Sequence, residues 1–165
     1  MAELNIAEKR LPQDGRFPFH QPDQSFDCRV SFCPSQYGEK IVIRLLNHYQ
    51  KTLSLNTIGI SETVLNTIKP HLAKPQGLVL ITGPTGSGKT QTLYSILDYL
   101  QRDNINISTI EDPIEIPLPG ITQTAVNPKI NLHFSSILRS LLRQDPDIIM
   151  IGEIRDKETA EIAIR

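Results

Sequence analysis

The stretch Gly83-Pro84-Thr85-Gly86-Ser87-Gly88-Lys89-Thr90 decides the fold class, because it stands between a strand pattern and a helix pattern. Residues 78–82, Leu-Val-Leu-Ile-Thr, are mainly apolar and predict a strand before it. Apolar residues recur at helical spacing behind it, at Leu93, Ile96, Leu97 and Leu100. The pattern Gly-x-x-x-x-Gly-Lys-Thr between a strand and a helix is typical of a loop that wraps the phosphates of a nucleotide.

The chemistry of this octet predicts a nucleoside triphosphate and Mg²⁺ as ligands. Its glycines let successive backbone N–H groups point at phosphate oxygens, and the N-terminus of the following helix adds positive potential. We expect the Lys89 ammonium to reach the β- and γ-phosphates and the Thr90 hydroxyl to bind Mg²⁺. The predicted nucleotide-binding residues are Gly83, Pro84, Thr85, Gly86, Ser87, Gly88, Lys89, Thr90 and Gln91.

The part of the chain that follows the octet alternates strand and helix patterns. Strand patterns cover residues 104–110, 121–126 and 148–151, an amphipathic helix pattern covers residues 134–143, and another helix starts near Asp156. Such alternation predicts an α/β fold with a mainly parallel sheet, in which ligands bind beyond the carboxyl ends of the strands. A nucleotide-binding sheet of this kind normally continues with further strands, so we expect this one to be incomplete at its C-terminal end.

Acidic residues follow two of these predicted strands. Glu111 comes after the first of the three, and Glu153 comes after the third. Glu153 is placed either to hold Mg²⁺ through a water molecule or to be a solvated charge at a strand end. We favour Glu111 as the residue that orients the attacking water, and the reverse assignment of the two glutamates stays open. Asp145 and Asp147 lie at the opposite end of the third strand, where we expect turn and capping residues.

Residues 1–52 predict a small α+β unit in front of the nucleotide-binding part. The patterns indicate a short helical start, a turn at residues 12–15, and two strands at residues 26–32 and 40–46. The loop at residues 34–38 should join these two strands in a hairpin.

Charged and thiol side chains in this first unit are candidates for separate roles. Patterns alone indicate a surface ion pair for each of Arg16, Arg29 and Arg44, although an arginine brought to the γ-phosphate would stabilise charge in the transition state. Cys28 and Cys33 are separated by an odd number of positions, so they should lie on opposite faces of a strand. We expect free thiols there, and neither a disulfide nor a zinc site.

Composition excludes several classes of protein. The formal net charge of −1 gives no basic surplus of the kind that marks a nucleic-acid binder, so direct binding of nucleic acid is not expected. The longest apolar runs are far shorter than the roughly 18 to 20 residues that a membrane-spanning helix needs. The N-terminus carries acidic residues where a signal peptide would have an apolar stretch. We therefore expect a cytoplasmic protein whose contact with membranes, if any, is peripheral.

Three stretches together carry a resemblance to a known family. They are the octet, the stretch Ile107-Ser-Thr-Ile-Glu-Asp-Pro-Ile-Glu115, and the stretch Leu142-Arg-Gln-Asp-Pro-Asp-Ile-Ile-Met-Ile-Gly-Glu-Ile-Arg155. With them the chain resembles the type II secretion and type IV pilus-assembly ATPases over nearly its whole length. Only the octet is generic; the other two stretches are specific to this family.

The resemblance implies a RecA-like P-loop NTPase domain in residues 53–165. Residues 1–52 would be the C-terminal part of the family's second N-terminal domain. The whole protein would be a motor that hydrolyses ATP to power type II secretion or type IV pilus assembly. It would form a homo-hexameric ring and bind peripherally to the cytoplasmic face of the inner membrane through a platform protein.

The resemblance also implies roles for single residues. Glu111 would belong to the family's aspartate box and Glu153 to a variant Walker B motif. Arg29 and Arg44 would approach the γ-phosphate, either in their own subunit or in a neighbour. The family's downstream histidine box and the zinc insert of many members are absent from this sequence. Two alternatives therefore stay open: a catalytically incomplete fragment that acts as an interaction module, or a related ring ATPase for DNA uptake or transfer.

Overall fold

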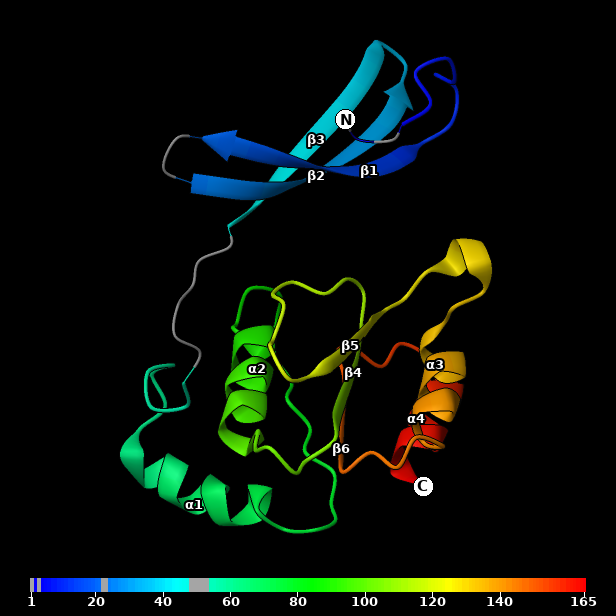
Figure 1. The fold of residues 1–165 in the computed structure, drawn as a ribbon. Coiled ribbons are helices and arrows are strands. Elements are labelled where there is room, and N and C mark those ends of the chain that lie inside the picture. The colour runs from blue at the N-terminus through cyan, green and yellow to red at the C-terminus, as the bar shows by residue number, and fades with distance from the viewer. Residues whose placement is uncertain (1, 3, 22–23, 48–53) are drawn as a thin grey trace. The chain divides into compact units, whose positions relative to one another are not determined.

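The chain forms two compact units in a computed structural model that describes residues 2, 4–21, 24–47 and 54–165 (Figure 1). Unit 1 spans Met1–Gln50 and unit 2 spans Lys51–Arg165. Each unit contains its own three-stranded sheet. Unit 1 has an antiparallel sheet, and unit 2 has a parallel sheet with helices on both faces.

Unit 1 consists of strands β1 (Gln13–Gln21), β2 (Gln24–Ser35) and β3 (Gly38–Asn47), in the order β1-β2-β3. The predicted hairpin is confirmed, because β2 and β3 pair up to the contact between Ser35 and Gly38. The predicted turn at residues 12–15 is wrong: Gly15 lies inside β1 and pairs with Val30.

The predicted helical start of unit 1 is also wrong for the described residues, which show only a turn at residues 6–7. The side chain of Gln13 explains this difference. Its amide accepts from the backbone N–H of Asn5 at 2.8 Å and donates to the backbone carbonyls of Asn5 and Glu8 at 3.0 and 2.7 Å. These backbone groups are therefore satisfied by a side chain of the sheet, and no helical turn is needed to satisfy them.

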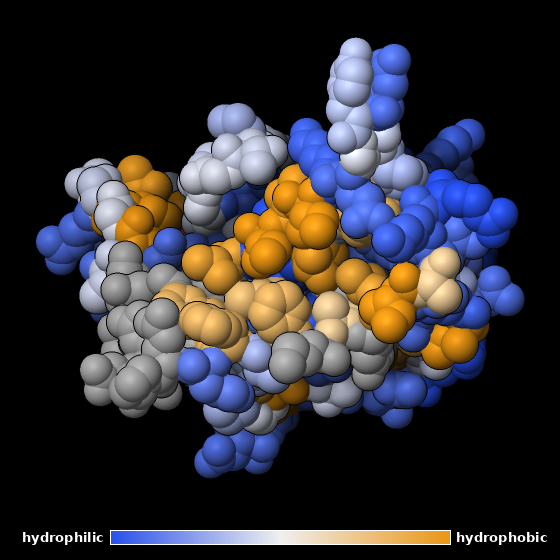
Figure 2. All heavy atoms as spheres, turned by 90° about the horizontal axis from the view of Figure 1, so that it is seen from above, coloured by the Kyte–Doolittle hydropathy of each residue, from blue (hydrophilic) through white to orange (hydrophobic). Residues whose placement is uncertain are grey.

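The sheet of unit 1 has an apolar face, as the alternation along residues 26–32 predicts. Cys28, Val30 and Phe32 on this face are only 1%, 8% and 9% exposed. The register of β3 adds Ile41, Ile43 and Leu45 to the same face, where they remain 56%, 54% and 61% exposed. Figure 2 shows apolar side chains gathered on the surface seen from above.

Unit 2 confirms the predicted parallel sheet, with strand order β5-β4-β6. Its elements are α1 (Glu62–Leu72), α2 (Lys89–Leu100), β4 (Ile107–Glu111), β5 (Thr122–Ala125), the 3-10 helix η1 (Pro128–Ile130), α3 (Phe134–Leu141), β6 (Ile148–Ile151) and α4 (Lys157–Ile164). Helix α2 covers one face of the sheet, and α3 and α4 cover the other (Figure 1). Successive side chains of a strand point to opposite faces, so Ile107 joins the core under α2 while Ile110 joins the core under α3.

The predicted strand at residues 78–82 is not formed. Leu78, Val79 and Leu80 are 54%, 53% and 67% exposed, and no strand among the described residues pairs with this segment. An apolar run becomes a strand only when another strand satisfies its backbone groups. The segment still leads the chain directly into the octet.

Candidate nucleotide site

The octet forms a tight loop that ends at the first turn of α2. Gly86 and Gly88 have φ angles of +80° and +88°, which is the left-handed region that glycine adopts without strain. Gly88 is the residue that caps the N-terminus of α2. A Cβ atom on Gly83 would lie 2.7 Å from the Ser87 hydroxyl oxygen, so a larger residue there would force this side chain to move.

Lys89 and Thr90 are the first two residues of α2. The Lys89 ammonium lies against the start of the loop and donates to the carbonyl oxygens of Gly83 and Pro84 at 2.9 and 2.8 Å. The first turn of α2 contains no acidic residue, so no nearby side chain there opposes a negative ligand. Helix N–H groups, an ammonium and a hydroxyl form a donor set that fits a polyphosphate with Mg²⁺.

Glu111 is the last residue of β4 and is buried, with 3% exposure. The Tyr94 hydroxyl on α2 donates to its Oε2 atom through a short hydrogen bond. Its Oε1 atom accepts from the Thr109 hydroxyl at 2.6 Å and from the Gln123 amide of β5 at 3.0 Å. The carboxylate is therefore bonded to α2, to its own strand and to the neighbouring strand.

Tyr94 was not among the residues that the sequence singled out. It is completely buried between α2 and the sheet, and burial raises the pKa of its hydroxyl strongly, with a further contribution from the hydrogen bond to Glu111 and its charge. One feature of the sequence could have indicated Tyr94: it lies one position after Leu93, among the apolar residues of α2. A tyrosine there has to find a partner for its hydroxyl group when it is buried.

Glu153 lies beyond the end of β6, on the same edge of the sheet as Glu111. The backbone N–H of Gly152 donates to the Ile110 carbonyl at 2.8 Å, which joins the ends of β6 and β4. The Glu153 carboxylate pairs with the Arg155 guanidinium, with 2.9 Å between Oε1 and Nη2. Arg155 was not among the predicted site residues, although it follows in the same Gly-Glu-Ile-Arg stretch.

The opposite edge of the sheet holds the two aspartates that were expected to be turn residues. Asp147 accepts from the backbone N–H of Asn106 at 2.7 Å, and the side-chain amide of Asn106 donates to the Asp145 carbonyl at 3.1 Å. Asp145 has a φ angle of +47°, which is typical of a turn. Both aspartates therefore serve the connection into β6.

The three arginines of unit 1 form a row across its sheet. Arg16 of β1 pairs with Arg29 of β2, and Arg29 pairs with Arg44 of β3. Directly opposite residues of antiparallel strands share a face, with Cβ atoms about 4.5–5.5 Å apart. Like charges placed directly opposite one another are unfavourable. That these three arginines are neighbours follows only from the strand pairing, because they are far apart in the sequence.

The whole chain matches one family of proteins. The model of the family described as "Type II/IV secretion system protein" matches residues 1–165. This chain belongs to that family. It is 52% identical over 165 residues to the protein transport protein HofB homolog of Escherichia coli strain K12 and covers 36% of that protein. It is 53% identical to the type II secretion system protein HxcR of Pseudomonas aeruginosa and covers 35% of it.

Solved structures of similar proteins support the same α/β P-loop NTPase fold. The Legionella pneumophila ATPase DotB superimposes with a TM-score of 0.70 and 28% identity, over 93% of this chain and 44% of that one. The pilus retraction motor PilT, solved with bound ADP, gives a TM-score of 0.69 and 32% identity, over 90% of this chain and 42% of that one. The chain spans about a third of the length of the curated relatives that it matches.

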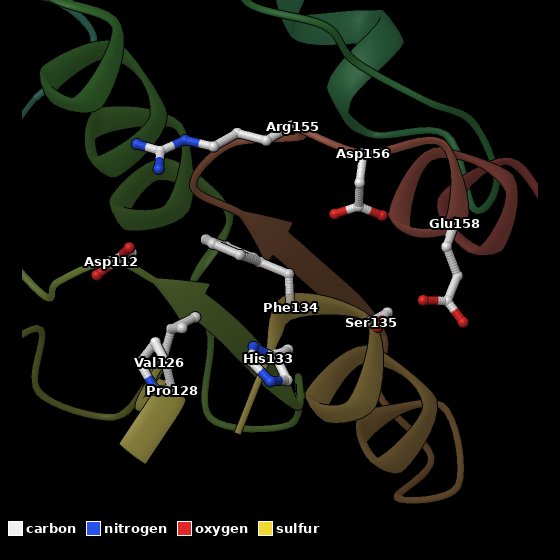
Figure 3. Close-up of a pocket in the computed structure, with 9 residues that line it drawn as sticks. All are labelled: Asp112, Val126, Pro128, His133, Phe134, Ser135, Arg155, Asp156 and Glu158. Atoms are coloured by element: carbon white, nitrogen blue, oxygen red, sulfur yellow. The ribbon is translucent and has the colours of Figure 1, made fainter. Parts of the chain in front are cut away.

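A pocket of about 390 Å³ lies at the starts of α3 and α4 in this family member (Figure 3). Asp112, Phe134 and Arg155 are among the residues that line it, whereas no residue of the octet does. The pocket is therefore not the place where the phosphate loop would hold a nucleotide.

A membrane-spanning helix and a cluster of metal-binding side chains are two features that the described residues lack. None of the helices in the described part of the chain has the length and apolar character needed to cross a bilayer. The described residues also contain no group of three or more His, Cys, Asp or Glu side chains that could hold a metal ion. Magnesium, in contrast, is usually bound by one or two carboxylates together with substrate phosphates.

Proposed function

We propose that residues 83–91 bind ATP with Mg²⁺ and that Glu111 and Glu153 serve its hydrolysis. One observation carries this proposal: Glu111 ends β4, Glu153 follows the end of the neighbouring parallel strand β6, and Glu111 is bonded through Tyr94 to the helix that begins at Lys89. Phosphoryl transfer asks a protein mainly for positioning and for stabilisation of charge. In this proposal the phosphate loop and the two carboxylates together supply both.

Each residue has a distinct part in this proposal. Lys89 and the N–H groups of the loop hold the phosphates, while Thr90 and Glu153 would hold Mg²⁺. When bound, Mg²⁺ neutralises charge on the β- and γ-phosphate oxygens. Glu111 orients the water that attacks the γ-phosphate.

The test uses a chimera in which residues 1–165 replace the matching segment of a full-length type II secretion system protein E. Lys89→Ala should lower ATP turnover by at least about 100-fold, because the phosphates lose their main positive partner. Glu111→Gln should lower kcat by about 100-fold and leave nucleotide affinity within about twofold, because a neutral amide accepts a hydrogen bond from the attacking water more weakly than a carboxylate does.

Two results would refute this assignment. One is normal turnover in the lysine variant, and the other is an unmutated chimera that does not hydrolyse ATP at all. Nucleotide binding without turnover would favour an interaction module. Binding is measured separately on the 165-residue chain with a fluorescent ATP analogue.

We also propose the finer features that the family suggests for the whole protein. Residues 1–52 are the end of the second N-terminal domain, and residues 53–165 begin the RecA-like domain. The full protein works as a homo-hexameric ring that a platform protein holds peripherally at the cytoplasmic face of the inner membrane. The names of HxcR and PilT support a role in type II secretion or in pilus function. If the ring is the active form, turnover per protomer should rise with protein concentration as the ring assembles. Turnover per protomer that is independent of protein concentration would count against the ring.

A further inference from the structure

We infer that Tyr94 is a positioning residue: together with Thr109 and Gln123 it holds the Glu111 carboxylate so that one acceptor position remains for the attacking water. This inference rests on the proposed role of Glu111. It concerns a residue of α2 that lies five positions beyond Lys89 and that the phosphate-loop pattern does not include.

The direction of the hydrogen bond between Tyr94 and Glu111 follows from a third group. The backbone N–H of Glu115 donates to the Tyr94 hydroxyl oxygen at 3.2 Å. A tyrosine hydroxyl has one proton, and an N–H group can only donate. The proton of Tyr94 must therefore point at Glu111, and the raised pKa of the buried hydroxyl keeps it there at neutral pH.

The orientation of the Gln123 amide follows in the same way from the donors and acceptors around it. Its Oε1 atom accepts from the backbone N–H of Leu118 at 2.7 Å. Its Nε2 atom donates to the Ile116 carbonyl at 3.1 Å and to Glu111 at 3.0 Å. A reversed amide would place its oxygen against two acceptors, so the –NH₂ group faces the carboxylate.

These donors leave the carboxylate with a single acceptor position. An ionised carboxylate has about four lone-pair sites, two on each oxygen. Thr109 and Gln123 occupy both sites of Oε1, and Tyr94 occupies one site of Oε2. The remaining site is on Oε2, which is the oxygen that Tyr94 holds.

The three donors to the Glu111 carboxylate belong to different elements, and this explains why Tyr94 matters most for placing the carboxylate. Thr109 belongs to the same strand as Glu111, and Gln123 belongs to the neighbouring strand β5. Tyr94 is the donor that comes from α2, whose first residue is Lys89. Its hydroxyl therefore fixes the carboxylate relative to the phosphate loop, whereas the other two fix it relative to the sheet.

The test is Tyr94→Phe in the chimera, which removes only the hydroxyl group. We expect kcat to fall by about tenfold, because a poorly placed reacting group is costly, while the affinity for the fluorescent ATP analogue stays within about twofold. Tyr99→Phe is the matched control, since Tyr99 lies on the same helix and is 38% exposed. It should leave both quantities unchanged.

A double variant separates positioning from a general structural role. If Tyr94 acts through Glu111, Tyr94→Phe should cost almost nothing further in the Glu111→Gln background, because residues that act as a unit are not additive. A second pair of variants acts on the same carboxylate: Thr109→Val, which removes a donor, should lose more turnover than Thr109→Ser, which keeps it.

The outcomes distinguish this inference from the proposed function. Normal turnover in Tyr94→Phe, with Glu111→Gln still impaired, overturns the positioning role alone. A tenfold loss that persists in the Glu111→Gln background also overturns it, since Tyr94 would then act independently. Normal turnover in Glu111→Gln itself overturns the role of Glu111 and, with it, the role of Tyr94.

Discussion

Gly152 shows at the scale of one residue how closely the two strand ends approach. A Cβ atom at this position would lie 3.2 Å from the Ile110 carbonyl oxygen and 3.7 Å from Cγ of Glu111. That carbonyl already accepts the N–H of Gly152 at 2.8 Å, so it has little freedom to move away. A larger residue here would push against the strand that carries the proposed catalytic glutamate.

Gly152→Ala should therefore lower both stability and turnover. Overpacking of this kind typically costs about 1–3 kcal/mol in the free energy of unfolding. Urea denaturation of the 165-residue chain measures that cost, and the chimera measures the loss of turnover caused by a displaced Glu111. Unchanged values in both measurements would show that the two strand ends are not in contact.

Single residues also show what the sequence could predict about the site and what it could not. Lys89, Thr90 and the loop glycines follow from a local pattern, because neighbouring residues of one loop act together. Glu111 became a candidate because it follows a predicted strand. Tyr94 was missed because its partner is 17 residues away in the sequence, and only the packing of α2 on the sheet brings the two together.

At the scale of elements, helix α4 starts near Asp156, as the sequence predicts, and the side chain of Asp156 caps it. The Asp156 carboxylate accepts from the Thr159 N–H at 2.7 Å and from the Thr159 hydroxyl at 2.9 Å. These hydrogen bonds, the backbone one first, hold the pKa of Asp156 below its ordinary value. A carboxyl whose folded-state pKa is lowered stabilises the protein above its unfolded pKa, about 3.9 for aspartate.

Asp156→Ala should consequently destabilise the chain in a pH-dependent way. The wild-type chain should be more stable than the variant at pH 6, and this advantage should shrink as the pH falls through the lowered pKa of Asp156. Thermal unfolding of both proteins between pH 6 and pH 3 measures the difference. Asp156→Asn is the matched control, because asparagine keeps an acceptor oxygen without a charge that titrates; a difference that stays constant with pH would contradict the prediction.

Hydrogen exchange offers a test of the segment before the octet. The amides of residues 78–82 should exchange faster than those of β4, because β4 pairs with strands on both sides and the segment pairs with no described strand. Mass spectrometry of the 165-residue chain after brief deuterium labelling measures both in one sample. Equal protection would show that the segment is a paired strand after all.

Most strands and helices could be predicted from periodicity, and the failures have physical causes. The apolar run 78–82 has the composition of a buried strand, but composition does not supply a pairing partner. Strand β1 was missed because Pro12 and Gly15 are typical of turns. Long-range pairing with β2 overrode that local preference. In both cases the outcome depends on a partner strand and not on the segment itself.

At the scale of the whole molecule, the arginine row of unit 1 makes a prediction about turnover. Arg29→Ala or Arg44→Ala in the chimera should lower kcat by about 1,000-fold with little effect on nucleotide affinity, because an arginine at the γ-phosphate acts mainly on the transition state. Lys40→Ala is a matched control on the same strand and the same face as Arg44. Normal turnover in both arginine variants would remove the row from the mechanism.

Mixing two inactive variants can show whose nucleotide the arginines serve. If Arg44 acts on the nucleotide of a neighbouring subunit, rings mixed from Lys89→Ala and Arg44→Ala chimeras should recover part of the turnover. If it acts within its own subunit, the mixture should stay inactive, because each protomer lacks one necessary group.

The two free thiols of β2 differ in a way that is useful for experiments. Cys28 is buried and Cys33 is exposed, so a maleimide dye should label one position without any mutation. The chain contains no tryptophan, which leaves little background emission in the ultraviolet. Energy transfer from a fluorescent nucleotide to a dye on Cys33 would then measure, in solution, how far the antiparallel sheet lies from the phosphate loop.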